Sequence, residues 1–423
     1  MPEAGRRKLI LSDGIALAGP ELRETPFRTL TLAGDSIVGF SGRPEDDSNA
    51  VVLDLNGAYV LPGLVDAHVH FDLSAAPAAY RRWAEPRLVR SLTCLHNGLV
   101  ALKSGITSAR DLGSVDSLVI EYASHVDRGA LRGPRITAAG RPITITGGHC
   151  AQYGRTASGA VDVREAVREQ VGAGARVIKI MATGGISTPG DPRSAQFTLE
   201  EITAAVEEAH KSGLQVAAHA HASAGITLAL AANVDTIEHA AFADQETLDA
   251  IKRVGKTVVP TVSALNNISD GLGIPAETVS KSLRARDTYR SSTAAAIRSG
   301  VRVAAGTDAG TALNPIGGLL DELQMYVQFG MSAFEAVRSA TVYAGPLVAS
   351  KLGIIEVGYK ADLVVVASDP REDVTALRHP LVVIAQGRQV PLPWVNETVE
   401  EIVGVVAGEP ALDMIKWESC LDN

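Results

Sequence analysis

Between residues 59 and 308 the chain repeats one pattern, in which a short apolar run alternates with a segment whose apolar side chains recur at helical spacing. Alternation of this kind is typical of β-α-β units, which build a parallel sheet. Eight such runs in a chain of 423 residues predict an α/β fold, a (β/α)8 barrel of the TIM type. The predicted strands are Tyr59–His70, Ser108–Gly113, Arg135–Gly140, Arg176–Ala182, Gln215–His221, Asp235–Ala240, Thr257–Val262 and Val301–Asp308.

Two of the predicted helices carry their own boundary signals. In the segment 198–213, Thr198 and Glu201 have the spacing of a capping box, and Gly213 follows the last turn. A longer, more polar helix is predicted over 276–299, and a glycine follows it.

Strand patterns also occur at both ends of the chain, outside the predicted barrel. We expect residues 1–60 and 350–392 to form a small β-sandwich domain, residues 61–349 to form the barrel, and residues 393–423 to form a terminal helix or arm. The strands expected in the small domain are Lys8–Leu11, Thr29–Leu32, Ile37–Phe40, Val51–Leu55, Gly353–Gly358, Ala361–Ala367 and Leu381–Arg388.

Charge and composition exclude several classes of function. The net charge is −9 and no basic stripe is present, which argues against a nucleic-acid partner. No apolar run is long enough to span a membrane or to serve as a signal peptide, so no membrane partner is expected. The three cysteines are scattered and odd in number, which favours a reducing, cytoplasmic compartment. They are Cys94, Cys150 and Cys420.

Metal-binding side chains gather at the ends of the predicted strands. His68 and His70 would point the same way from one strand, because strand side chains alternate. Lys179 lies inside an apolar strand, where a charged amine is costly without a partner. Each residue alone has a structural alternative, such as a core histidine, a lysine at a sheet edge or an aspartate that begins a helix. Together they predict a metal site at one barrel mouth. The set is His68, His70, Lys179, His219, His221, His239 and Asp308.

Other polar residues near the predicted mouth give weaker signals. The glycine-rich run 182–190 lacks the Gly-Lys-Ser/Thr ending of a phosphate loop. Cys150 follows His149, but no third residue that would orient a thiol nucleophile is evident. Arg110 and Asp111 lie at a strand end, where an internal ion pair that braces the barrel is as good an interpretation as a ligand role. Weak candidates on mouth loops are Tyr153, Thr183 and Ser187.

These motifs resemble the amidohydrolase superfamily over nearly the whole chain. The run Met181–Ser187, together with Gly147–His149, is similar to the branch of Xaa-Pro and Xaa-Arg/Lys dipeptidases and ochratoxin-hydrolysing amidases, with imidazolonepropionase as a related neighbour. One departure is Asn314, because the run Asn-Pro-Ile-Gly stands where this branch often has His-Gly. The resemblance is carried by Leu61–His70, Gly105–Gly113, the Lys179 strand, His219, Ile237–His239, Gly306–Asp308 and Gly358–Val366.

The resemblance implies a centre of two divalent metal ions, with zinc as the first choice and manganese or cobalt still open. In such a centre Lys179 would be N-carboxylated and bridge the metals. His68, His70 and Asp308 would bind one ion, and His219 and His239 the other. An apolar strand lowers a lysine pKa, and a carbamate forms only on the neutral amine.

The implied reaction is hydrolysis of the amide bond of a dipeptide or N-acyl amino acid by a metal-bridging hydroxide. Asp308 would act as the proton shuttle. Strand alternation lets both His219 and His221 face the mouth, and the family places the ligand at the first. His221 would then polarise the carbonyl or hold a substrate carboxylate, and His149 would contact that carboxylate. Tyr153 and Arg110 are weaker substrate contacts.

Two alternatives remain at this stage. One is a deaminase or cyclic amidase, similar to imidazolonepropionase, that acts on a small heterocycle; such deaminases usually lack the bridging lysine. The other is a catalytically inactive scaffold, in which ligands are typically lost. A homo-oligomer is also expected. The substrate's acyl group and amine would be selected by the mouth loops 71–92, 141–160 and 183–197, whose conformation a single sequence does not define.

Overall fold

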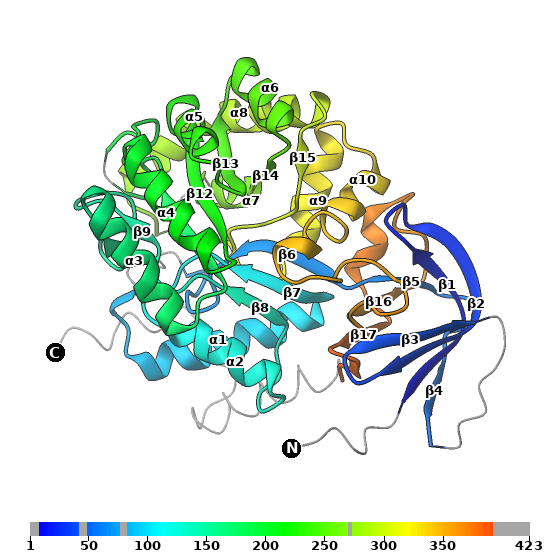
Figure 1. The fold of residues 1–423 in the computed structure, drawn as a ribbon. Coiled ribbons are helices and arrows are strands. Elements are labelled where there is room, and N and C mark those ends of the chain that lie inside the picture. Colours follow the sequence, from blue (N-terminus) through cyan, green and yellow to red (C-terminus); the bar gives the residue numbers. More distant parts are fainter. Residues whose placement is uncertain (1–7, 42–48, 77–82, 189, 270–272, 392–423) are drawn as a thin grey trace.

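A computed structural model describes residues 8–41, 49–76, 83–188, 190–269 and 273–391 of the chain. Two units, a barrel and a smaller sheet, lie side by side within this part (Figure 1). The predicted terminal helix or arm at 393–423 and Cys420 lie outside the described residues.

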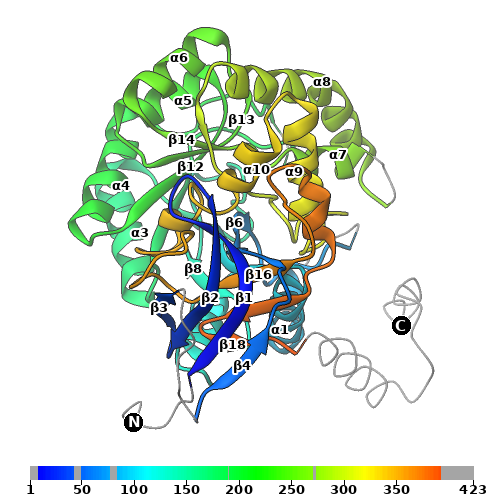
Figure 2. The same ribbon diagram turned by 90° about the vertical axis from the view of Figure 1, so that its right-hand side faces the viewer.

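The smaller unit is a mixed sheet to which both ends of the chain contribute strands (Figure 2). Its strands follow the order β18-β17-β16-β5-β1-β2-β3, and β4 pairs with β1. The early strands are β1 (Leu9–Ala18), β2 (Arg23–Ala33), β3 (Ser36–Ser41), β4 (Val51–Asp54) and β5 (Tyr59–Pro62), and the late strands are β16 (Leu363–Val366), β17 (Val382–Ala385) and β18 (Arg388–Gln389).

The prediction of a strand at Gly353–Gly358 is wrong. This segment forms turns in which Gly353 and Gly358 adopt φ of 83° and 88°. The left-handed backbone at its two ends is incompatible with a continuous strand. Ile355 is still buried in the core of the small sheet. The apolar pattern therefore predicted the burial of this segment correctly, but not its backbone conformation.

The eight predicted barrel strands all have counterparts in the structure. The strands form two groups, and neighbouring strands within each group pair in parallel. Two further backbone hydrogen bonds connect the edge strands of one group to those of the other. Arg176 N donates to Ala138 O (3.0 Å), and Ala67 N donates to Ala305 O (2.9 Å). The strands are β6 (Leu64–Val69), β7 (Ile106–Asp111), β8 (Arg135–Ala138), β11 (Val177–Met181), β12 (Gln215–Ala222), β13 (Thr236–Phe242), β14 (Thr257–Val259) and β15 (Arg302–Val303). Two short strands extend this sheet: β9 (Ile143–Thr144) pairs with β11, and β10 (Arg155–Thr156) pairs with β9.

Helices surround the barrel strands (Figure 1). The predicted capping box is present at the start of α4, where Thr198 and Glu201 exchange side-chain and backbone hydrogen bonds. The long helix predicted over 276–299 is α8. The helices are α1 (Arg87–Lys103), α2 (Leu118–Asp127), α3 (Gly159–Ala173), α4 (Leu199–Lys211), α5 (Ser223–Ala231), α6 (Gln245–Val254), α7 (Val262–Ser269), α8 (Ala276–Arg298), α9 (Leu319–Gln328) and α10 (Ala333–Ser339), with short 3₁₀ turns at Gly345–Leu347 and Val374–Arg378.

The segment predicted as one strand, Tyr59–His70, is divided at Gly63 between the two units. β5 belongs to the small sheet and β6 to the barrel. A Cβ atom on Gly63 would lie 1.9 Å from Oγ1 of Thr107 on β7. A glycine is therefore required where the chain passes from one unit to the other.

The alternation of β11 fixes the direction of Lys179. Ile178 and Ile180 pack into the core cluster that contains residues of α3 and α4. Because side chains alternate along a strand, Lys179 points to the opposite side, into the barrel. Across the described residues, no helix combines the length and apolar character needed to cross a membrane.

Candidate metal centre

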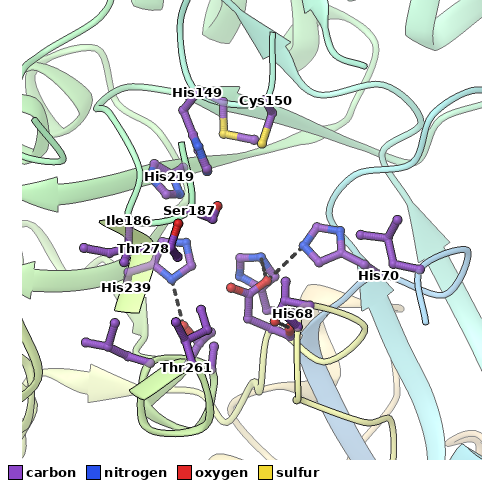
Figure 3. Close-up of a pocket in the computed structure, with 18 of the residues that line it drawn as sticks. His68, His70, His149, Cys150, Ile186, Ser187, His219, His239, Thr261 and Thr278 are labelled. Atoms are coloured by element: carbon purple, nitrogen blue, oxygen red, sulfur yellow. Dashed lines mark hydrogen bonds and ion pairs between the residues drawn. The ribbon is translucent and has the colours of Figure 1, made fainter. Parts of the chain in front are cut away.

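The donors predicted from the sequence converge on one cavity, which the other predicted substrate contacts also line except for Arg110. Figure 3 shows the imidazoles of His68, His70, His219 and His239 around this cavity. They come from the ends of β6, β12 and β13, and Asp308 comes from the loop after β15. The carboxyl ends of parallel barrel strands meet at one mouth, which explains the convergence.

One group of donors is centred on Asp308. Its Oδ1 lies 2.9 Å from Nε2 of His70 and 3.5 Å from Nε2 of His68. The ligand atoms of His68, His239 and Asp308 all lie within 4.8 Å of one another. An oxygen and two imidazole nitrogens form a donor set that suits zinc and related divalent ions.

A second group is formed by His219, His221 and His239, whose ligand atoms also lie within 4.8 Å of one another. The ring centroid of His219 lies 4.6 Å from that of His221 and 4.6 Å from that of His239. Three buried imidazoles at this spacing would repel one another if they were charged. His239 belongs to both groups, so the two sets of donors adjoin.

Burial keeps most of these imidazoles neutral, which is the form that binds metals. It lowers the pKa of His68 to about 4 and that of His221 to about 3. The pKa of His219 and of His239 lies well below the usual value for the same reason. Burial opposes protonation of His70 too, but its hydrogen bond to Asp308 raises the pKa to about 8.

Asp308 stays ionised at neutral pH. Burial alone would raise the pKa of this carboxyl group, but the nearby His68 and the hydrogen bond from His70 hold it below the usual value. The Asp308 side chain is 18% exposed, against 2% for His68 and 7% for His70. Its carboxylate is therefore the donor most accessible from the cavity.

Lys179 is the least satisfied polar group of the centre. Its side chain is buried, and its Nζ atom has no hydrogen-bond partner. Burial lowers the pKa of Lys179 to about 8. An orphaned amine beside imidazole and carboxylate donors fits a site that holds further groups when the protein is loaded.

Each of three histidines has one ring nitrogen engaged by the protein, which leaves the other available as a ligand. Nδ1 of His239 lies 2.7 Å from Oγ1 of Thr261, and Nε2 of His219 donates to the carbonyl oxygen of Gly184 (3.0 Å). Nδ1 of His68 lies 2.9 Å from Oε2 of Glu238.

The sequence reasoning did not single out Glu238, which stands inside the quoted motif Ile237–His239 and contacts His68. Its second oxygen accepts a hydrogen bond from Arg110 (2.8 Å), and both side chains are fully buried. Arg110 lies outside the cavity lining, and its partner is Glu238 rather than Asp111. Its position fits the bracing role rather than contact with substrate.

The other residues predicted near the mouth lie on the loops after β9 and β11. Nδ1 of His149 lies 3.0 Å from Oγ1 of Thr188, and burial lowers the His149 pKa to about 4. Tyr153 and Ser187 line the cavity. Thr183 is buried outside the lining, and its hydroxyl accepts a hydrogen bond from the backbone nitrogen of His221 (3.0 Å).

Cys150 has the environment of an inert thiol. Burial raises its pKa to about 12, and its sulfur accepts a hydrogen bond from the Tyr153 hydroxyl (3.2 Å). A thiol with so high a pKa is a poor nucleophile at neutral pH.

The backbone at the mouth adopts left-handed conformations at non-glycine residues. φ is 74° at His239, 55° at Thr261 and 58° at Asp308. Such conformations are costly and persist where the surrounding structure enforces them, often at functional sites. Thr261 is the strongest outlier of the three, because a β-branched residue rarely adopts this region, whereas histidine and aspartate are enriched among the non-glycine residues that do.

The comparisons with known proteins agree with this geometry. Residues 59–396 match the model of the amidohydrolase family. Ochratoxinase of Aspergillus niger is 31% identical over 401 residues, which cover 84% of this chain and 81% of the relative. Among solved structures, a Xaa-Pro dipeptidase with methionine bound in its active site is 31% identical, with a TM-score of 0.82 and coverage of 90% of this chain and 99% of the other. A prolidase complexed with N-methylphosphonate-L-proline is 30% identical, with a TM-score of 0.83 and the same coverage. The resemblance inferred from the motifs is confirmed: the chain belongs to the amidohydrolase family.

Proposed function

We propose that this protein is a metal-dependent hydrolase that cleaves the amide bond of a dipeptide or an N-acyl amino acid. The observation that carries the proposal is the buried, unpartnered Nζ of Lys179 among histidine and carboxylate donors. The relatives named above are ochratoxinase, a Xaa-Pro dipeptidase and a prolidase, and the dipeptidase structure holds methionine in its active site.

The proposed cofactor is a pair of divalent metal ions, with zinc as the first choice. His68, His70 and Asp308 would hold one ion, and His219 and His239 the other. Lys179, N-carboxylated, would bridge them. A bound divalent ion supplies Lewis acidity, which polarises a carbonyl oxygen and lowers the pKa of water.

Asp308 is proposed as the proton shuttle. Its carboxylate is ionised at neutral pH and is the most exposed of the donors compared above. It can accept a proton from the attacking water and pass it to the nitrogen of the leaving amine. Oδ1 of Asp308 lies 2.9 Å from Nε2 of His70, so these two atoms are placed to share the first ion.

His221 and His149 are proposed to contact substrate. Nδ1 of His221 is buried without a hydrogen-bond partner, so a substrate carbonyl oxygen could satisfy it. Nδ1 of His149 is occupied by Thr188, which leaves Nε2 for the carboxylate of the substrate. As a neutral imidazole, His149 would act as a hydrogen-bond donor rather than as a cation.

The two alternatives fit the centre less well. A deaminase or cyclic amidase with a single metal ion would not need a buried lysine amine at position 179. An inactive scaffold gives no reason to retain all six proposed ligands beside one cavity. A cytoplasmic location and a homo-oligomeric assembly stay predictions from the sequence.

The proposal is tested by measuring the metal content of the purified protein and screening it against dipeptides and N-acyl amino acids. We expect two metal ions per chain and release of a free amino acid, which a chelator abolishes and added zinc restores. One metal ion per chain, with ammonia released from heterocycles instead, would favour the deaminase. Full metal content without hydrolysis of any amide would contradict the proposal.

A further inference from the structure

We infer that Glu322 is a positioning residue of the metal centre, which holds the turn at Thr261 and thereby orients the ring of His239. The inference rests on the metal-dependent hydrolysis proposed above and deepens it by naming a residue that acts on the centre without touching it. Glu322 lies on α9 and does not line the cavity. Three sets of contacts connect its buried carboxylate to residues that do.

The first contacts lie between the Glu322 carboxylate and the start of α7. Its Oε1 accepts a hydrogen bond from Val262 N (2.8 Å), and its Oε2 accepts one from Ser263 N (2.7 Å). The first backbone amides of a helix have no partner within the helix, and a carboxylate there is favoured by the helix dipole and by charge-assisted hydrogen bonds. Glu322 therefore fixes where the backbone enters α7.

The second contacts concern Thr261, the residue immediately before α7. Its φ of 55° is costly for a β-branched residue, so the surrounding structure has to enforce it. The hydrogen bonds from Val262 and Ser263 to Glu322 hold the backbone directly after this residue. Oγ1 of Thr261 lies 2.7 Å from Nδ1 of His239. When Nδ1 donates this bond, Nε2 is the nitrogen that remains for a metal. Glu322 therefore acts on His239 through Thr261.

The third contacts lead to Asp308. The hydroxyl of Ser263 donates to the carbonyl oxygen of Thr307 (3.1 Å), the residue directly before Asp308. Nδ2 of Asn314 donates to the same carbonyl oxygen (2.8 Å), so this segment has a second support that does not depend on Glu322. Loss of the carboxylate on α9 should therefore disturb Asp308 less than the histidine side of the centre.

The contacts of Glu322 require a carboxylate rather than another side chain of the same size. Burial raises the pKa of Glu322 to about 7, although the hydrogen bonds from Ser263 and Val262 lower it. A group with one acceptor for each of the two amides offsets this cost. A glutamine has one acceptor oxygen, and its NH2 group would face the second backbone N–H. Glu322→Gln therefore changes the shape of the side chain little but releases one of the two anchors.

Glu322→Gln tests the inference by metal binding and by a spectrum, both independent of turnover. We expect affinity for one of the two proposed ions to fall by roughly 10- to 100-fold in a zinc competition titration. On the cobalt-loaded protein the visible absorption bands should shift, because they report the geometry of the ligands around the ion. Glu246→Gln on α6 is the matched control. Wild-type affinity and an unchanged spectrum in Glu322→Gln would overturn the inference.

Thr261 provides a test that holds even if Glu322→Gln does not fold. Thr261→Val replaces only the hydroxyl by a methyl group and leaves both anchors of α7 in place, so it should lower metal affinity and shift the cobalt spectrum in the same way. Thr261→Ser retains the hydroxyl and should keep the affinity and spectrum of the wild type. The double variant Glu322→Gln/Thr261→Val should lose little more affinity than Thr261→Val alone. Additive losses, or wild-type binding in Thr261→Val, would overturn the inference.

The same measurements separate this inference from the proposed function. Hydrolysis of amides by the wild type, with metal binding unchanged in Glu322→Gln, would overturn the inference and leave the function standing. A wild-type protein that binds two ions but hydrolyses no amide would contradict the function. A loss of affinity in Glu322→Gln and Thr261→Val would support the inference in that case too.

Discussion

Glu238 holds Nδ1 of His68 with one carboxylate oxygen, at 2.9 Å, and Arg110 with the other. The pKa of Glu238 is lowered to about 2: burial raises it, but Arg110 and His68 outweigh burial. This buried carboxylate therefore fixes which nitrogen of His68 remains for a metal. It also neutralises a buried arginine.

Glu238→Gln should weaken metal binding and the fold together. The amide would still accept one hydrogen bond, but its NH2 group would face either His68 or the guanidinium of Arg110. We expect metal affinity to fall by roughly 10- to 100-fold, as for other partners of metal-bound histidines. A competition titration with a chromophoric chelator measures this. Glu246→Gln, on the exposed face of α6, is the matched control. Unchanged affinity in Glu238→Gln would show that His68 is not a ligand.

Asp308→Asn should lower kcat/KM by roughly 10²- to 10⁴-fold, because an amide cannot carry the proton from water to the leaving amine. Metal content must be measured on the same sample, since Asp308 is also a proposed ligand. Asp321→Asn, exposed on α9, makes the same chemical change away from the cavity. An Asp308→Asn protein with both metals and full turnover would exclude the shuttle role.

Lys179→Met should have opposite effects on the loaded and the metal-free protein. We expect metal content to fall, because the bridging group is lost. In chelator, however, the variant should be more stable than the wild type at neutral pH. The pKa of Lys179 falls from 10.5 to about 8 in the fold, which corresponds to a cost of roughly 3 kcal/mol while the amine is charged.

The pH dependence supplies the control for the lysine variant. The unfolded chain keeps the Lys179 proton up to about pH 10.5, whereas the folded chain releases it near pH 8. Between these values the unfolded state binds more protons, so the wild type gains stability as pH rises. The difference between wild type and Lys179→Met should shrink over this window in urea denaturation. A constant difference would mean that the folded chain releases no Lys179 proton over this window, so that burial does not lower the pKa of the amine.

Gly63→Ala should destabilise the fold by roughly 1–3 kcal/mol, the usual cost of overpacking. The new methyl group would overlap the hydroxyl of Thr107, whose oxygen is buried without a partner. Thr107→Ala removes that hydroxyl. The double variant should therefore be more stable than the sum of the two single changes predicts. Strict additivity in urea denaturation would contradict the contact.

Much of the fold follows from the sequence because burial leaves a periodic pattern. The eight barrel strands and helices α4 and α8 have apolar spacing or caps that local rules can interpret. The division at Gly63 has no such signal, since it depends on Thr107 approaching from another strand. The segment 353–358 was misassigned because turns can bury an isoleucine as well as a strand does.

The donors of the site were predictable for a different reason. A parallel barrel brings the ends of its strands to one mouth. Histidines at the strand ends can therefore be placed at the site without knowing the conformation of the loops. Trp83 and Ile268 reach the same cavity from a loop and from α7, by packing that one sequence does not specify. Glu238 was overlooked because its role depends on contacts with two other strands.

The pairing of β5 with β16 has a consequence for biosynthesis. Pro62 pairs with Leu363, so the strand that leads into His68 and His70 is flanked on one side by a segment translated about three hundred residues later. During synthesis the early strands can pair with one another, but this edge of β5 stays open until residue 366 has left the ribosome. A nascent chain that stops earlier would expose an unpaired strand edge beside its first two metal ligands, and chaperones or neighbouring chains could pair with it.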